Sequence, residues 1–246
     1  MTRKLLFFAF LAFLTFVDCG YGPEMFAHPQ PDTYKKWLFW TIRPTLIKYN
    51  LHDRDFTEWT NKLDTFLEEY SANSDSRQTC THSTVGTEKI PCDVDMRGFG
   101  PCSSKNSYGY DKGQPCVFLS LEKRDDWMPE FFNDVKKLPV DMPTQLKSFI
   151  NSSTGTLDNI WVSCDGETPV DVENIGPISY YPKNYFPGYY FPYKNQKNYL
   201  SPLIAIQLEK PTRGVVINIR CKAWVGNIEY CTKNRLGTVN FELLID

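Results

Sequence analysis

The segment YYPKNYFPGYYFPYKNQKNYLSP, residues Tyr180–Pro202, is rich in aromatic residues and repeatedly interrupted by proline. It contains seven of the 14 tyrosines of the chain. Proline fixes φ and donates no backbone hydrogen bond, so the prolines exclude a helix or an ordinary central strand here. We expect an extended, rigid segment that runs over a folded body. Tyrosine suits interfaces because it combines a large contact area with a polar tip, but a long loop packed on its own domain explains the composition equally well.

The regions around this segment predict β-structure. Runs rich in Val, Ile and aromatic residues are typical of strands, and they occur at Cys116–Leu121, Asn159–Ser163, Pro202–Leu208, Gly214–Trp224 and Thr238–Ile245. In Gly214–Trp224 polar and apolar residues alternate, which predicts a strand with one face in solvent.

Two further segments predict helices. Leu51–Ala72 carries apolar residues at helical spacing, and Asp53 or Asp55 can cap its start. Met142–Ile150 can form a short helix with Pro143 in its first turn. By contrast, Met25–Asn50 is rich in proline and aromatic residues without a clean period, so we interpret it as an extended stalk.

The composition limits the function classes. The 246 residues, 41% hydrophobic and 23% charged, are typical of a globular chain with one large or two small domains. The net charge of −2 and the lack of a basic block argue against nucleic acid as a partner. No GxSxG, HExxH or phosphate-binding glycine loop occurs, so we predict no enzyme activity, no cofactor and no small-molecule substrate.

A group of carboxylates follows Cys164 in the stretch CDGETPVDVEN. Oxygen-rich clusters can hold calcium, but the spacing here is not that of an EF-hand. We therefore expect a solvated, hydrogen-bonded loop and no metal site at these residues, which are Asp165, Glu167, Asp171 and Glu173.

The N-terminus decides the compartment. After Arg3 and Lys4, the apolar run Leu5–Val17 covers roughly 20 Å, which is short of the ~30 Å hydrocarbon core of a membrane. It is either a signal peptide cleaved near Cys19 or Gly20, or part of a strained span over Leu5–Ala27 that carries Asp18 and Glu24. Both interpretations place the body outside the cytoplasm, in an oxidising space.

In such a space the cysteines are expected to form disulfides. Loop length favours Cys80–Cys92 and Cys102–Cys116, and Cys164 and Cys221 adjoin apolar runs, which suits a long-range bridge between strands. Spacing alone does not settle the pairing, and no CxxC or CxxH pattern supports the rival zinc site. Asn151-Ser152-Ser153 is a glycosylation sequon, which would be usable in an extracellular loop.

Several motifs together resemble the β-subunit of the sodium/potassium-transporting ATPase. The resemblance covers roughly Lys36 to the C-terminus, and its order and spacing are specific. The matching stretches are YGYDKGQPCVFLSL (Tyr108–Leu121), WVSCDGE with DVENIG (Trp161–Gly176), FPGYYFPYKNQKNYLSPLIAIQL (Phe186–Leu208), INIRCKAW with NIEY (Ile217–Tyr230) and FELLID (Phe241–Asp246).

The resemblance implies a mainly β fold, an immunoglobulin-like β-sandwich ectodomain with one packed α-helix, preceded here by a short N-terminal hydrophobic helix. It implies three bridges, Cys80–Cys92, Cys102–Cys116 and Cys164–Cys221. Cys231 lies outside them, either free or paired with Cys19 or another chain. The expected organisation is an N-terminal hydrophobic segment over residues 1–27, an extracellular stalk over 28–50 and the ectodomain over 51–246.

The resemblance also implies a function. The family's subunit does no chemistry itself, but assembles with the catalytic α-subunit, helps it fold and reach the plasma membrane, and tunes sodium and potassium handling. We expect a single-pass type II membrane protein with the C-terminal body outside. Six residues would contact the α-subunit, and several of them should be more exposed in the isolated chain than large aromatic residues normally are: Tyr189, Tyr190, Phe191, Tyr193, Tyr199 and Leu200. The alternative is a secreted or weakly anchored extracellular binding or adhesion protein on the same fold.

Overall fold

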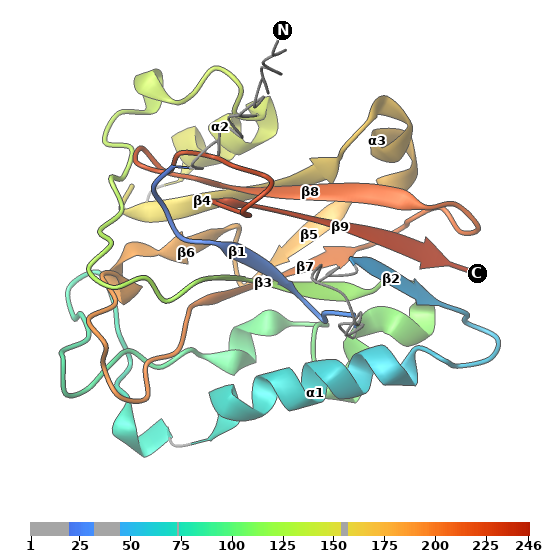
Figure 1. Cartoon of the computed structure of the whole chain (residues 1–246), viewed down its shortest axis with the longest axis horizontal. Helices are drawn as coiled ribbons and strands as arrows, with labels where there is room; N and C mark the ends of the chain where they lie inside the picture. Colours follow the sequence, from blue (N-terminus) through green and yellow to red (C-terminus); the bar gives the residue numbers. More distant parts are fainter. Residues whose placement is uncertain (1–19, 32–44, 73, 154–156) are drawn as a thin grey trace, which may run out of the picture.

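A computed structural model describes residues 20–31, 45–72, 74–153 and 157–246. Within these residues the strands form two β-sheets that lie one above the other, with a long helix along the outer side of one of them (Figure 1). The fold is mainly β and is consistent with the β-sandwich that the sequence predicts. The N-terminal hydrophobic helix that was also expected lies outside the described residues.

The four-stranded sheet is buried on both faces. Its order is β1 (Met25–His28), β3 (Cys116–Leu121), β7 (Leu203–Leu208) and β5 (Ile178–Tyr181), and all neighbours pair antiparallel. Every residue of β3 and β7 is buried. A strand without a wet face needs cover on both sides, which the second sheet and the long helix provide (Figure 1).

The five-stranded sheet packs one face on the core and leaves the other partly in solvent. Its order is β2 (Leu46–Tyr49), β9 (Thr238–Ile245), β8 (Ile217–Trp224), β4 (Asn159–Gly166) and β6 (Tyr185–Pro187), with β2 parallel to β9 and the other pairs antiparallel. On the outer face Trp161 and Trp224 are buried in a second cluster with Met142, Leu146 and Ile150. Burial alternates along β8, where Ile217, Ile219, Cys221 and Ala223 are buried as the sequence predicts. The alternation arises because only one face packs on the core.

The long helix α1 (Thr57–Ser71) packs its apolar stripe, Trp59, Leu63, Leu67 and Tyr70, into the core. The predicted caps are wrong. Phe56 holds the N-cap position without a side-chain hydrogen bond, and the Asp55 carboxylate instead accepts a hydrogen bond from the backbone N–H of Asn50. The helix is therefore stabilised by the packing of its apolar stripe and not by a capping side chain.

The remaining helices are short. α2 (Thr144–Ser152) begins after Pro143, close to the predicted helix. α3 (Pro169–Ile175) has a capping box formed by Thr168 and Asp171. Five 3₁₀ helices complete the described elements: η1 (Ser74–Ser76), η2 (Met96–Phe99), η3 (Ser104–Lys112), η4 (Val135–Lys137) and η5 (Gly188–Tyr190).

Three disulfides tie the described chain together, two across short loops and one across 57 positions. The bonds Cys80–Cys92, Cys102–Cys116 and Cys164–Cys221 are present, the same pairs that the resemblance implies. Cys164 and Cys221 face each other across β4 and β8. Cys231 takes part in none of these three but is also disulfide-bonded. Cys19, one of its expected partners, lies outside the described residues.

Both ends of the segment that was expected to be a stalk belong to the sheets. Met25–His28 forms β1 and Leu46–Tyr49 forms β2. Met25 is fully buried and Ala27 is nearly so, so a span that reaches Ala27 is wrong at its last residues, which pair with β3. Among the described residues, no helix combines the length and apolar character that a membrane crossing requires.

Candidate partner-binding surface

The tyrosine-rich segment Tyr180–Pro202 connects the two sheets. It begins in β5, the edge of the four-stranded sheet, and continues into β6, the edge of the five-stranded sheet. Pro187 thus lies on an edge strand, where a missing backbone N–H removes no ladder bond. The predicted extended course is confirmed only in part, because the segment contains two short strands and also a 3₁₀ helix, η5 (Gly188–Tyr190).

Gly188 allows the chain to turn sharply after β6. Its backbone N–H donates to the carbonyl oxygen of Asp158 at 2.9 Å. A Cβ at this position would lie 2.5 Å from both that oxygen and the ring of Phe131. Only glycine fits so close an approach, and the turn places the next residues, Tyr189 and Tyr190, beside the Cys80–Cys92 loop.

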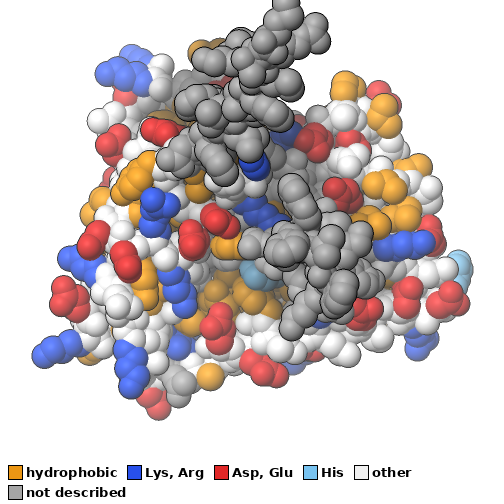
Figure 2. Space-filling view, in the orientation of Figure 1, with side chains coloured by type: hydrophobic (Ala, Val, Ile, Leu, Met, Phe, Trp, Pro, Cys, Tyr) orange, Lys and Arg blue, Asp and Glu red, His pale blue; other side chains and the backbone are white. Residues whose placement is uncertain are grey.

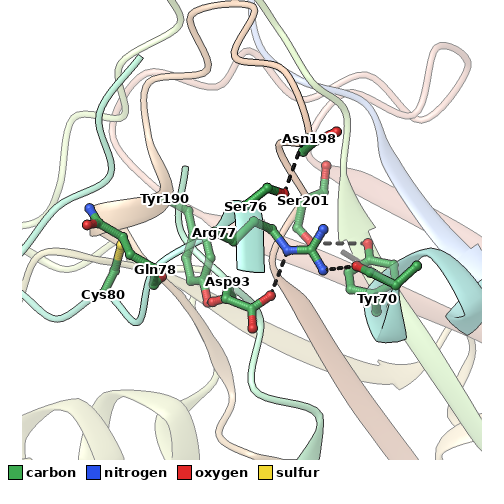
Figure 3. A network of polar contacts seen from close by, with 10 residues as sticks. Tyr70, Ser76, Arg77, Gln78, Cys80, Asp93, Tyr190, Asn198 and Ser201 are labelled. Carbon is green, nitrogen blue, oxygen red and sulfur yellow. Dashed lines mark hydrogen bonds and ion pairs between the residues drawn. The ribbon is translucent and has the colours of Figure 1, made fainter. Parts of the chain in front are cut away.

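A buried ion pair supports this corner (Figure 3). The Arg77 Nε donates to Asp93 Oδ1 at 2.7 Å, and another guanidinium N–H donates to the carbonyl oxygen of Ala72 at the end of α1. The Arg77 side chain is 2% exposed and that of Asp93 30%. The backbone carbonyl of Asp93 also accepts a hydrogen bond from the Tyr190 hydroxyl at 2.8 Å. The pair therefore joins α1, the disulfide loop and the tyrosine-rich segment.

Tyrosine hydroxyls fasten the rest of the segment to the body. The hydroxyl of Tyr199 donates to the carbonyl oxygen of Tyr190 at 3.1 Å. The hydroxyl of Tyr70, on α1, donates to the backbone carbonyl oxygen of Ser201 at 3.1 Å. The Asn198 side chain donates to the Ser76 hydroxyl (Figure 3). The two tyrosine bonds satisfy polar tips in a buried setting, whereas the Asn198–Ser76 bond lies at the surface.

Burial keeps these hydroxyls protonated. It raises the pKa of Tyr190 and of Tyr199 above the ordinary tyrosine value, because the phenolate would lose its hydration. Burial likewise raises the pKa of Tyr180 to about 12, although its oxygen accepts a hydrogen bond from the backbone N–H of Cys164. The three groups are therefore neutral at physiological pH.

The structure contradicts the prediction that several of the six partner-binding residues are unusually exposed, because three of them are buried and the other three are half-buried. Tyr190, Tyr199 and Leu200 are only 8%, 6% and 4% exposed. Tyr189 and Phe191 are half-buried against the core, and Tyr193 is half-buried with its ring 4.9 Å from that of Tyr199. Amino-acid composition cannot distinguish a tyrosine that contacts a partner from one whose hydroxyl donates to a backbone carbonyl elsewhere in the same chain.

The exposed apolar surface at this corner lies on neighbouring segments. A cavity of about 330 Å³ opens between the Cys80–Cys92 loop and the tyrosine-rich segment, and Val85, Met128, Tyr189 and Phe191 are among the residues that line it. Val85 and Met128 are 56% and 55% exposed. We call this cavity and its rim the corner groove. Nothing in the sequence signalled that Val85 or Met128 would be exposed, because Val85 stands alone in a polar loop and Met128 follows Trp127, a residue type that is usually buried.

The acidic cluster is hydrogen-bonded as predicted, but it is not a solvated loop, because Asp165 lies in β4 and Asp171 and Glu173 lie in α3. Hydrogen bonds from Thr168 and Asn218 lower the pKa of Asp171, which is buried. Glu167 forms an ion pair with Arg220. In the part of the chain that the structure describes, no three His, Cys, Asp or Glu side chains are grouped as metal ligands would be.

Charges on the visible face are mixed rather than segregated. Figure 2 shows lysine and arginine side chains interspersed with aspartate and glutamate over the face that it presents. This agrees with a net charge of −2 and gives that face no basic patch for nucleic acid. The sequon residue Asn151 is exposed in the last turn of α2, as a glycosylation site requires.

Comparisons with known proteins agree on one family. The family described as "Sodium / potassium ATPase beta chain" matches residues 20–241. The chain is 41% identical over 239 residues to sodium/potassium-transporting ATPase subunit beta-2 of Drosophila melanogaster, covering 92% of this chain and 72% of that protein. It is 40% identical over 194 residues to subunit beta-1 of the same organism, covering 76% of this chain and 61% of that protein.

A more distant relative is also named as a subunit of this ATPase. Sodium/potassium-transporting ATPase subunit beta-2 of Homo sapiens is 26% identical over 198 residues, which cover 73% of this chain and 60% of that protein. The chain thus spans about three fifths to three quarters of the length of these relatives.

Proposed function

Because the chain belongs to the sodium/potassium ATPase beta chain family, we propose that it is the non-catalytic β-subunit of a sodium/potassium-transporting P-type ATPase. In this role it assembles with the catalytic α-subunit, supports its folding and delivery to the plasma membrane, and tunes its cation affinity. The family match over residues 20–241 carries the proposal, because it extends over both sheets and the corner groove. The relatives are named as pump subunits, which favours this function over a secreted adhesion protein.

The corner groove is the proposed contact with the extracellular part of the α-subunit. Val85 and Met128 supply exposed apolar area at its rim. The outward atoms of the half-buried Tyr189, Phe191 and Tyr193 extend that area. Association buries such apolar surface, and rigid aromatic side chains lose little entropy in the process.

The buried tyrosines have a different part in this interface. Tyr190 and Tyr199 hold the segment in place through hydrogen bonds to backbone carbonyls. A surface whose supports are already fixed loses less conformational freedom on binding. We therefore assign affinity to the rim and preorganisation to the two buried tyrosines.

Charged substitutions at the rim test this assignment. Met128→Glu and Val85→Glu place a charge where a partner would exclude water, and each should weaken α-subunit binding by at least about tenfold, or about 1.4 kcal/mol. Val140→Glu is the matched control, because Val140 is 97% exposed and does not line the groove. The measurement is co-precipitation of the tagged chain with a co-expressed α-subunit, normalised to folded chain. Equal binding by all three variants would place the interface elsewhere.

A further inference from the structure

A second and larger cavity lies beside the other end of the tyrosine-rich segment. It measures about 810 Å³ and is lined by the last turn of α2, by β4, and by the chain around β5 and β6. Its volume is within the range of sites for small organic ligands. It is separate from the corner groove, and the proposed assembly with an α-subunit does not use it.

Aromatic rings form much of its wall. Trp161, from β4, contacts Tyr185 edge-on at 5.0 Å between ring centroids and Phe149 of α2 at 6.2 Å. All three residues line the cavity, and Phe149 is 40% exposed at its side. Such rings offer flat apolar faces against which the C–H face of a sugar ring can pack.

Two buried polar atoms of the lining have no hydrogen-bond partner. They are the Trp161 Nε1 and the Asn184 Oδ1. The first can only donate and the second can only accept. An unsatisfied buried polar atom costs about 1–3 kcal/mol, so a ligand that offers one acceptor and one donor would be favoured. An acetamido group attached to a sugar offers both.

The glycosylation sequon lies at the same cavity. Ser152 and Ser153 of the triplet line it, and Asn151, next to them, is exposed. Their hydroxyls already donate to the carbonyl of Phe149, which fixes the last turn of α2 against the cavity. A glycan on Asn151 would therefore start at the rim of an aromatic cavity that has both polar groups its first sugars need.

We propose that the cavity holds the first N-acetylglucosamine residues of an N-glycan attached to Asn151. The aromatic wall packs against the sugar rings, the Trp161 indole N–H donates to an acetamido or hydroxyl oxygen, and the Asn184 side chain accepts from an N–H or O–H of the sugar. The glycan then covers this edge of the five-stranded sheet instead of extending freely into solvent.

The first experiment observes the indole directly. The full-length chain is produced in glycosylating cells with ¹⁵N-labelled tryptophan, and its indole signals are compared with all sugar present, with only the first N-acetylglucosamine left by an endoglycosidase, and after complete removal. The Trp161 signal should shift on complete removal. The Trp59 signal should not, because its indole N–H donates to the Lys48 carbonyl. Identical Trp161 signals in all three forms, or an Asn151 that mass spectrometry finds unmodified, would overturn the proposal.

A second experiment measures how accessible the glycan is. Asn184→Leu removes the acceptor at similar size, so an endoglycosidase should cut the native protein about fivefold faster, the effect of losing one hydrogen bond. Asn61→Leu, on an exposed position of α1, should leave the rate unchanged. If the endoglycosidase cut Asn184→Leu at the wild-type rate, the proposed binding of the glycan in the cavity would be contradicted.

Free chitobiose, added to the completely deglycosylated chain, distinguishes the source of the sugar. Restoration of the Trp161 signal by free sugar, together with an unmodified Asn151 in the native chain, would mean that the cavity binds a glycan of another molecule, and the proposal would be wrong. Restoration with Asn151 modified supports it.

Discussion

The Arg77–Asp93 pair permits a quantitative test of how the corner is held together. In Asp93→Ala the Arg77 guanidinium, whose side chain is 2% exposed, keeps its bond to the Ala72 carbonyl but loses the carboxylate with which it forms an ion pair. Breaking a buried pair on one side costs about 3–5 kcal/mol, because a charge is left buried without compensation. Asp93 is 30% exposed, so water can partly replace it, and we expect a loss of about 2–4 kcal/mol in the free energy of unfolding.

Two matched variants separate the stranded charge from the lost hydrogen bond. Arg77→Met removes both charge and bond, so it should cost only about 1–2 kcal/mol. Asp93→Asn retains an oxygen acceptor but leaves the guanidinium charge without a countercharge, so it should cost about 2–3 kcal/mol. In all three variants the Asp93 backbone carbonyl can still accept from Tyr190.

Urea unfolding of the full-length chain with its disulfides intact, followed by tryptophan fluorescence, gives the three free energies. The expected order of destabilisation is Asp93→Ala, then Asp93→Asn, then Arg77→Met. If Arg77→Met were clearly worse than Asp93→Ala, the stranded-charge argument would be refuted. The bond to Ala72 would then be the main contribution of Arg77.

Three other predictions concern the body of the protein. Replacing Cys164 and Cys221 together by Ser should lower the free energy of unfolding by about 4 kcal/mol, and replacing Cys80 and Cys92 together should lower it by about 3 kcal/mol. The difference is expected because the first bridge closes a loop of 57 residues and the second a loop of 12. Equal losses in urea unfolding would contradict the loop-entropy argument. Burial lowers the pKa of His28 from 6.5 to about 4, so the folded state disfavours the protonated ring. The free energy of unfolding should therefore be unaffected above pH 6.5 and should fall by up to about 2 kcal/mol as the pH is lowered to 5. A His28→Phe variant with the same pH dependence would show that other groups cause the loss. Thr168→Ala, which removes the N-cap of α3, should lower stability by about 1 kcal/mol, while the exposed Val170→Ala should not; similar losses in thermal unfolding would refute the capping role.

The sequence predicted the long strands because their signal is local. Cys116–Leu121 and Thr238–Ile245 form strands with the predicted bounds, since a run of β-branched and aromatic residues between turn residues needs no distant partner to be recognised. The strands β1 and β2 were missed for the opposite reason. They have four residues each, and their partners lie roughly 90 and 200 positions further along the chain.

The candidate site was predictable only in outline. Proline, glycine and tyrosine content indicated an extended aromatic segment, and the disulfide loop beside it came from cysteine spacing and the family resemblance. Whether Tyr190 points outward or donates to the Asp93 carbonyl depends on tertiary contacts across 97 positions. No local pattern contains that information, and the exposed Met128 was missed because one methionine in a loop has no signature.

The central claim is that this chain functions as a subunit of a cation pump rather than alone. Its most direct test is purification of a C-terminally tagged chain, expressed at its natural level, from detergent-solubilised membranes of its own cells. We predict that a P-type ATPase α-subunit co-purifies with it in about equal amounts and that Met128→Glu reduces this yield. Recovery of the tagged chain from the medium, cleaved near Gly20 and without any α-subunit, would contradict the account.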